Sequence, residues 1–169
     1  MSPSTARTAV PSNDTTWTDT DPERDVLAKI TGKAPGRIPT TGERLKALRQ
    51  RLNDPVLAER PPRRRRVVGY LQALPGQATA DAEATLRTDA DRRGWDMTKV
   101  FIDPVGTLPP RKRDDWLMAR KHVYEGYADG VIVLDRRHIS ADEHEYVAEL
   151  EFVCGRRGFV ALVVAETDV

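Results

Sequence analysis

From about Arg66 to Val164, short continuous apolar runs alternate with segments whose apolar residues recur every three or four positions. The apolar runs are typical of buried strands and lie at residues 67–72, 99–102, 131–134 and 159–164. The helical segments lie between them, at residues 79–92, 114–127 and 140–154. Because buried strands alternate with helices, the pattern predicts an α/β fold in which helices cover both faces of a parallel sheet.

Two predicted helices begin with capping signals. Ser140 and Glu143 have the spacing of a capping box, which predicts that the last helix begins there. Thr40 and Glu43 repeat this spacing earlier in the chain and predict an extra helix that ends near Ala58. Its apolar stripe consists of Leu45, Leu48, Leu52 and Val56. Either the domain that follows or a separate protein must cover this stripe.

The first part of the chain has a different composition. Residues 1–39 are rich in Ser, Thr, Pro, Asp and Gly and contain few large apolar groups. Such a segment cannot bury enough surface to offset its chain entropy, so we expect a largely disordered arm. Within it, residues 22–30 could form a short helix whose formation depends on a partner surface. The predicted organisation is an arm at 1–39, an amphipathic helix and linker at 40–62, and an α/β domain at 63–169.

Overall composition narrows the class of protein. The 27 Lys and Arg residues nearly balance the 26 Asp and Glu residues, so the net charge of +1 gives no global argument for nucleic-acid binding. The single cysteine, Cys154, excludes an intramolecular disulfide, and no apolar run reaches the length of a membrane span. We therefore expect a cytoplasmic protein. Its richness in Arg, Ala, Asp and Thr is typical of a high-GC bacterial genome.

Four adjacent arginines, Arg63, Arg64, Arg65 and Arg66, lead into the first predicted strand. Four consecutive side chains cannot share one face, so some must project toward solvent, where they could contact nucleic-acid phosphates. A solvated junction accounts for the same run equally well, since it is short and contains no aromatic residues.

Charged residues also follow the predicted strands, where ligands gather in parallel sheets. They form a cationic rim with two carboxylates, made of Asp103, Arg111, Lys112, Arg113, Asp135, Arg136, Arg137 and His138. Such a rim suits a phosphate, but charged residues also gather at strand ends because these ends are wet, and Asp135 could simply form an ion pair with an arginine. No glycine-rich phosphate loop is present and the histidines lack metal-ligand spacing, so we expect neither a cofactor nor a metal.

Several motifs follow one another in a fixed order along this segment. Gly69-Tyr70 lie in the first strand, Asp103 follows the second, Arg113 precedes Trp116 at the start of a helix, and Leu134-Asp135-Arg136 follow the third strand. In order and spacing these motifs resemble the catalytic domain of the resolvase/invertase family of serine recombinases. The resemblance covers about residues 66–165 and implies a resolvase-like fold.

The same resemblance implies that catalytic positions have changed. The family's nucleophilic serine corresponds to Leu74, and two of its arginines correspond to Gln72 and Ile139. Leucine can neither attack a phosphodiester nor stabilise charge on it, so the resemblance implies a protein that is no longer an enzyme and has no catalytic residues.

Taken together, the sequence predicts an inactive recombinase-like protein that acts as a DNA-associated accessory or regulatory factor with non-specific affinity. The candidate phosphate-binding residues are Arg63, Arg64, Arg65, Arg66, Arg111, Arg113, Asp135 and Arg136. The alternative is a protein-interaction or self-association module, in which the helix at 40–58 binds a partner or a second copy.

Overall fold

A four-stranded parallel sheet forms the centre of the structure, a computed structural model that describes residues 37–59, 61–106 and 108–168. Its strands are β1 (Arg66–Ala73), β2 (Asp96–Pro104), β3 (Gly130–Val133) and β4 (Phe159–Leu162). They run in the order β2-β1-β3-β4, and every neighbouring pair is parallel. Every residue of β3 and β4 is buried, which is why these strands are continuous apolar runs in the sequence.

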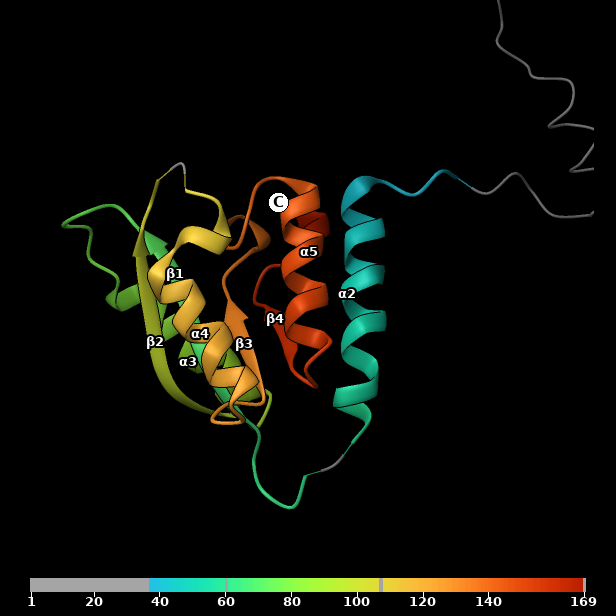
Figure 1. Ribbon diagram of the computed structural model, residues 1–169, viewed down its shortest axis with the longest axis horizontal. Coiled ribbons are helices and arrows are strands. Elements are labelled where there is room, and N and C mark those ends of the chain that lie inside the picture. Colours follow the sequence, from blue (N-terminus) through green and yellow to red (C-terminus); the bar gives the residue numbers. More distant parts are fainter. Residues whose placement is uncertain (1–36, 60, 107, 169) are drawn as a thin grey trace, which may run out of the picture. The chain divides into compact units, whose positions relative to one another are not determined.

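Helices cover both faces of this sheet, as predicted (Figure 1). The helices are α2 (Thr41–Ala58), α3 (Ala80–Arg92), α4 (Asp114–Tyr124) and α5 (Glu143–Cys154), with short 3-10 turns at Pro110–Lys112, Arg136–His138 and Glu166–Asp168. Helices α4 and α5 pack on one face through Trp116, Val123 and Leu150, while α3 packs on the other through Leu86 and Ala90. The predicted α/β fold, a parallel sheet covered by helices on both faces, is confirmed.

The extra helix α2 docks on its own domain, beside α5 and the edge strand β4 (Figure 1). Leu45 is buried in the core, and Leu52 packs against it. Asn53 donates from Nδ2 to the Val160 carbonyl at 2.8 Å and accepts from the Val160 N–H at 3.1 Å. The side chain of Asn53 therefore pairs with β4 as a neighbouring strand would, which closes this edge of the sheet.

A buried ion pair fixes the same helix to the C-terminal segment. Arg49 donates to both carboxylate oxygens of Glu166, at 2.7 and 3.0 Å, and the Tyr146 hydroxyl donates to the same carboxylate at 2.8 Å. Burial alone would raise the pKa of Glu166, but the adjacent Arg49 guanidinium lowers it below its usual value. Helix and segment approach so closely that a Cβ on Gly42 would lie 2.5 Å from the Glu166 carbonyl oxygen. The Arg49–Glu166 ion pair and the close approach at Gly42 can form only when α2 packs against the C-terminal 3-10 turn.

The structure corrects some of the predicted boundaries. Helix α5 begins at Glu143 with Asp142 as its N-cap, whose carboxylate accepts from the Glu145 N–H at 2.9 Å, so the predicted capping box at Ser140 and Glu143 is wrong. Strand β2 extends beyond the predicted residues 99–102 at both ends. The prediction was too short because β2 lies at the edge of the sheet, where exposed polar residues interrupt the apolar pattern. The predicted helix at 22–30 lies outside the described residues, as does the predicted arm up to residue 36.

Candidate functional site

The carboxyl ends of the strands bring the motif residues together, and Asp103 lies at their centre. Its buried carboxylate accepts from the Tyr70 hydroxyl at 3.0 Å and from the backbone N–H groups of Trp116 and Asp115 at 2.9 and 3.1 Å. Burial raises the pKa of Tyr70 above its usual value, so this hydroxyl stays protonated and remains a donor. Asp103, near the end of β2, thus caps the N-terminus of α4.

Arg113, a candidate phosphate contact, points into the protein, and only 8% of it is exposed. It donates from Nε to the Leu108 carbonyl at 2.7 Å and from Nη1 to the Ile139 and His138 carbonyls at 2.7 and 3.2 Å. In the amide orientation that matches donors to acceptors, the Gln72 oxygen also accepts from Arg113, at 3.0 and 3.1 Å. The guanidinium therefore joins β1, the loop after β2 and the turn after β3.

Next to the hydrogen bonds of Arg113 lies an open pocket of about 330 Å³, lined by Gln72, Val105, Asp135, Arg137 and His138. His138 accepts from the Gln72 N–H through Nδ1 at 3.0 Å, which requires this nitrogen to be unprotonated. Burial lowers the pKa of His138, and the nearby Asp135 opposes this effect. Asp135 accepts from the Arg137 N–H at 2.7 Å, and no arginine side chain forms an ion pair with it among the described residues.

Three arginines around this end of the sheet keep much of their charge accessible. Arg137 is exposed, and Arg136 is half-buried with one bond from Nη1 to the Ala141 carbonyl at 2.9 Å. The side chain of Arg111 is 69% exposed and lies 3.3 Å from one oxygen of Glu149. We call Arg111, Arg136 and Arg137 the carboxyl-end rim.

Sequence reasoning missed Glu149 as a member of this region. Its carboxylate is buried, yet it accepts from the Trp116 indole and the Arg120 guanidinium, each at 2.9 Å, in addition to Arg111. The available signal was its position next to Leu150 on the inward face of the predicted helix, where an unpaired carboxylate would be costly. One buried carboxylate thus serves two arginines.

The positions that the sequence resemblance matches to the family's catalytic residues lie in contrasting surroundings. Leu74 is 59% exposed at the end of β1, whereas Ile139 is fully buried in the core. Ser140, which closely follows the third-strand motif in sequence, is buried, donates to Glu145 at 2.7 Å and accepts from the Asp142 N–H at 3.1 Å. Its hydrogen bonds are therefore already made within the turn that leads into α5.

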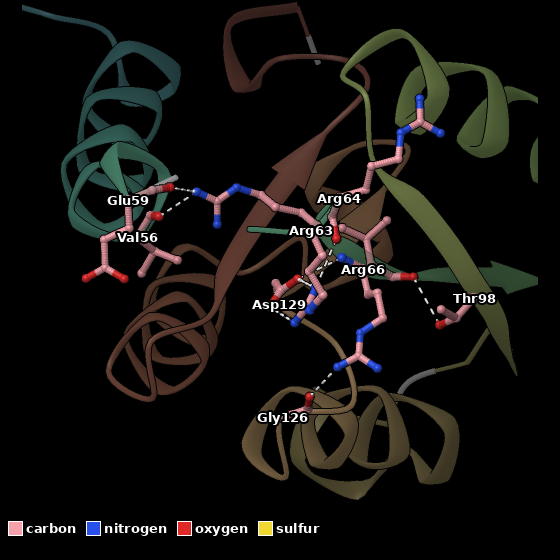
Figure 2. A network of polar contacts seen from close by, with 10 residues as sticks. Val56, Glu59, Arg63, Arg64, Arg66, Thr98, Gly126 and Asp129 are labelled. Atoms are coloured by element: carbon pink, nitrogen blue, oxygen red, sulfur yellow. Dashed lines mark hydrogen bonds and ion pairs between the residues drawn. The ribbon is translucent and has the colours of Figure 1, made fainter. Parts of the chain in front are cut away.

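The arginine run lies at the opposite end of the sheet, where β1 begins (Figure 2). Arg63 makes two parallel bonds to Asp129, at 2.7 and 2.9 Å, and the Arg66 N–H donates to the same carboxylate at 2.7 Å. The Arg66 guanidinium donates to the Gly126 carbonyl at 3.0 Å. Burial would raise the pKa of Asp129, but the bond from Arg63 lowers it below its usual value. These contacts fix the turn before β3 to the start of β1.

The other two arginines of the run also contact the protein. Arg65 donates to the carbonyls of Val56 and Leu57 at 2.8 and 3.3 Å and to that of Glu59, and so binds the otherwise unpaired carbonyls at the end of α2. Arg64 is 63% exposed and lies 3.4 Å from Asp96. The run leads into β1, whereas the carboxyl-end rim follows β2 and β3 at the other end of these parallel strands. The two groups of candidate residues therefore lie at opposite ends of the sheet.

Within the described part of the chain, no group of three or more His, Cys, Asp or Glu side chains could hold a metal ion. No helix in that part is both long enough and apolar enough to cross a membrane.

Comparison with solved structures identifies this arrangement. The C-terminal catalytic domain of ISC1926 TnpA, an IS607-like serine recombinase, superposes with a TM-score of 0.52 at 18% identity over 59% of this chain and 71% of that one. The N-terminal catalytic domain of TP901-1 integrase gives 0.52 at 14% identity over 58% and 76%. The chain has the fold of a serine recombinase catalytic domain. No protein-family model matches the sequence, and no curated protein does.

Proposed function

We propose that this serine-recombinase-like chain is catalytically inactive and associates with DNA as an accessory or regulatory factor. One observation carries the proposal: cations at the carboxyl-end rim stay accessible, while the adjacent catalytic positions hold Leu74, Gln72 and Ile139. Binding can therefore persist where the groups for chemistry are missing.

The surroundings of these positions support the loss of catalysis. Cleaving a phosphodiester through a covalent intermediate needs a hydroxyl nucleophile and positioned cations around the phosphoryl group. Leu74 offers no hydroxyl, Ile139 is buried in the core, and Arg113 donates to backbone carbonyls. Ser140 cannot substitute because its hydroxyl is already bonded to Glu145. Each missing group forfeits about a hundredfold in rate or more, so cleavage would fall to the uncatalysed level.

The accessible arginines support DNA association without sequence reading. Guanidinium groups bind phosphate oxygens in pairs, and such contacts position a protein on DNA while carrying no sequence information. For each phosphate that the rim neutralises, the slope of log affinity against log salt concentration becomes more negative by about 0.9. Three rim arginines therefore predict weak, strongly salt-dependent binding.

Fluorescence anisotropy with a labelled duplex, between about 50 and 200 mM salt, tests this proposal. The rim variant changes Arg111, Arg136 and Arg137 to alanine. The matched control changes Arg63 and Arg64, exposed arginines at the other end of β1 whose loss leaves the Arg65 contacts with α2 in place. We expect salt-sensitive binding by the wild type, a slope shallower by about three in the rim variant, and little change in the control.

Each remaining outcome has its own meaning. If only the Arg63 and Arg64 variant loses affinity, DNA contacts the arginine run and the rim has another role. If no protein binds DNA at low salt, the DNA proposal is rejected. A cleavage assay on supercoiled DNA tests inactivity separately, since nicking by the purified wild type that Ser140→Ala abolishes would contradict it.

A further inference from the structure

The outer faces of α4 and α5 form an open apolar groove of about 300 Å³. It is lined by Leu117, Arg120, Lys121, Tyr124 and Phe152, and we call it the α4–α5 groove. Leu117 and Phe152 are each 38% exposed and Tyr124 is 57% exposed, and together they form an apolar patch across the two helices. Leu117, Lys121 and Tyr124 follow one another at helical spacing, so they form a stripe along α4.

Cations surround and underlie this apolar surface. The Arg120 guanidinium lies 3.6 Å from the centre of the Phe152 ring, and the Arg156 guanidinium lies 4.9 Å from that of Tyr124. Lys121 lies 3.8 Å from Glu125 and is 57% exposed. No carboxylate in the described part of the chain pairs with Arg156. The groove therefore combines an apolar surface with an excess of positive charge.

Beneath the groove, that excess is only partly neutralised. The buried Glu149 carboxylate is shared by Arg120 at 2.9 Å and Arg111 at 3.3 Å, so one negative charge faces two positive ones. The Nε of Arg120 is buried without a hydrogen-bond partner. A negative charge brought to the groove would be attracted by this cluster.

We infer that the α4–α5 groove binds an acidic amphipathic helix of a protein partner. Aromatic and arginine side chains dominate the binding energy of protein interfaces, and the groove presents Tyr124, Phe152, Arg120 and Arg156 together. An amphipathic helix inserts apolar residues at positions i, i+3 or i+4, and i+7 into such grooves. Acidic residues flanking that stripe would pair with Lys121 and Arg156.

Two other occupants fit the groove less well. A second copy related by a two-fold axis would place the same cations opposite each other, because such an interface joins identical surfaces. Single-stranded nucleic acid favours an aromatic platform in a groove that follows its backbone, whereas Leu117 and Phe152 lie in a short groove with an apolar lining. No rim residue lines the groove, although Arg111 of the rim shares the Glu149 carboxylate with Arg120. The peptide experiment below requires no DNA binding, so either proposal can fail without the other.

Fluorescence anisotropy of the full chain with three labelled peptides of about 14 residues, close to four helical turns, tests the inference. The first peptide has Leu and Phe at i, i+4, i+7 and i+11 with Glu on its polar face. The second replaces every Glu by Lys, and the third keeps the Glu residues but scrambles the apolar positions. We expect the acidic amphipathic peptide to bind at least about tenfold more tightly than either control, a difference of about 1.4 kcal/mol.

Variants locate the binding surface. Phe152→Ala and the double variant Lys121→Glu with Arg156→Glu should each weaken binding of the acidic peptide at least about tenfold. Tyr127→Ala removes an aromatic side chain that is 59% exposed and lies outside the groove, and it should leave peptide binding unchanged. Thermal melting checks that each variant is folded.

Three outcomes would overturn the inference: no binding of the acidic peptide, equal binding of the acidic and basic peptides, or binding that the groove variants leave unchanged. Displacement of the peptide by a single-stranded oligonucleotide whose own binding requires Phe152 would assign the groove to nucleic acid instead. Sedimentation velocity adds a final check, since self-association that Phe152→Ala abolishes would assign the groove to a second copy.

Discussion

Replacing Asn53 with alanine removes both hydrogen bonds between α2 and the edge strand β4. In the folded protein Asn53 is 3% exposed and Val160 is fully buried. The side-chain amide of Asn53 accepts a hydrogen bond from the Val160 N–H at 3.1 Å and donates one to the Val160 carbonyl at 2.8 Å. Alanine can offer neither a donor nor an acceptor, so both backbone groups of Val160 would lose their partners inside the protein.

The structure sets the size of the effect. A buried polar group left without a partner costs about 1–3 kcal/mol, so two such groups together cost about 2–6 kcal/mol. A domain of this size is stable by roughly 5–15 kcal/mol, so the change would remove a large part of the total. Asn53→Asp separates the two bonds, because a carboxylate still accepts from the Val160 N–H but repels its carbonyl.

Urea unfolding followed by far-UV circular dichroism gives the free energy of unfolding of each variant. Gln50→Ala is the matched control, since it truncates an exposed amide on the same helix and should change stability by less than about 0.5 kcal/mol. Native-state hydrogen exchange should show faster exchange of the Val160 amide in Asn53→Ala. If Asn53→Ala costs no more than Gln50→Ala, and the Val160 amide keeps its protection, the amide does not hold the edge strand and our reasoning fails.

Three further predictions concern stability. Arg49→Ala leaves the buried Glu166 carboxylate without its cation and should cost about 3–5 kcal/mol in urea unfolding, part of which Glu166→Gln in the same chain should restore. Gly42→Ala should lower the free energy of unfolding by about 1–3 kcal/mol, because the new Cβ would lie 2.5 Å from the Glu166 carbonyl oxygen. Gly106→Ala is the control, since its Cβ would meet nothing closer than 4.0 Å. Equal losses of stability in the two variants would contradict this prediction. Because folding lowers the pKa of His138, the unfolded chain binds more protons, so the stability contributed by the neutral imidazole is present above about pH 6.5 and is lost as the pH falls through the folded-state pKa. Urea unfolding at several pH values should therefore show a fall below about pH 6.5 that is shallower in His138→Gln, and an identical pH dependence in both proteins would refute the assignment.

The sheet could be predicted from the sequence because its central strands are buried on both faces. A continuous apolar run such as Val131–Val133 indicates a buried strand when it is short and helical periodicity follows it. The apolar stripe of α2 was equally visible, but periodicity cannot identify the surface that covers it. Leu45 and Leu52 show that its own domain covers much of it, a choice that depends on contacts with β4 and Glu166 more than a hundred residues away.

The candidate site was harder to predict, because a charged residue in a sequence does not reveal whether its side chain points into the protein or toward solvent. Arg113 and Arg137 read alike as members of one rim, yet one donates to backbone carbonyls inside the protein and the other is exposed. Arg63 finds its carboxylate partner 66 residues later, at Asp129. Local sequence contains no information on such pairings, so the residue types at the strand ends were predictable but their individual contacts were not.

The position of α2 has a consequence for how the protein is made. This helix leaves the ribosome before the four strands of the sheet, yet its partners on β4 and Glu166 lie 107 and 117 residues later in the chain. Until those residues emerge, its apolar stripe has nothing of its own domain to cover it. Contacts of such long range slow folding and leave apolar surface open to aggregation in the meantime. The helix that completes the fold is thus the first part of this domain to be synthesised and among the last to find its place.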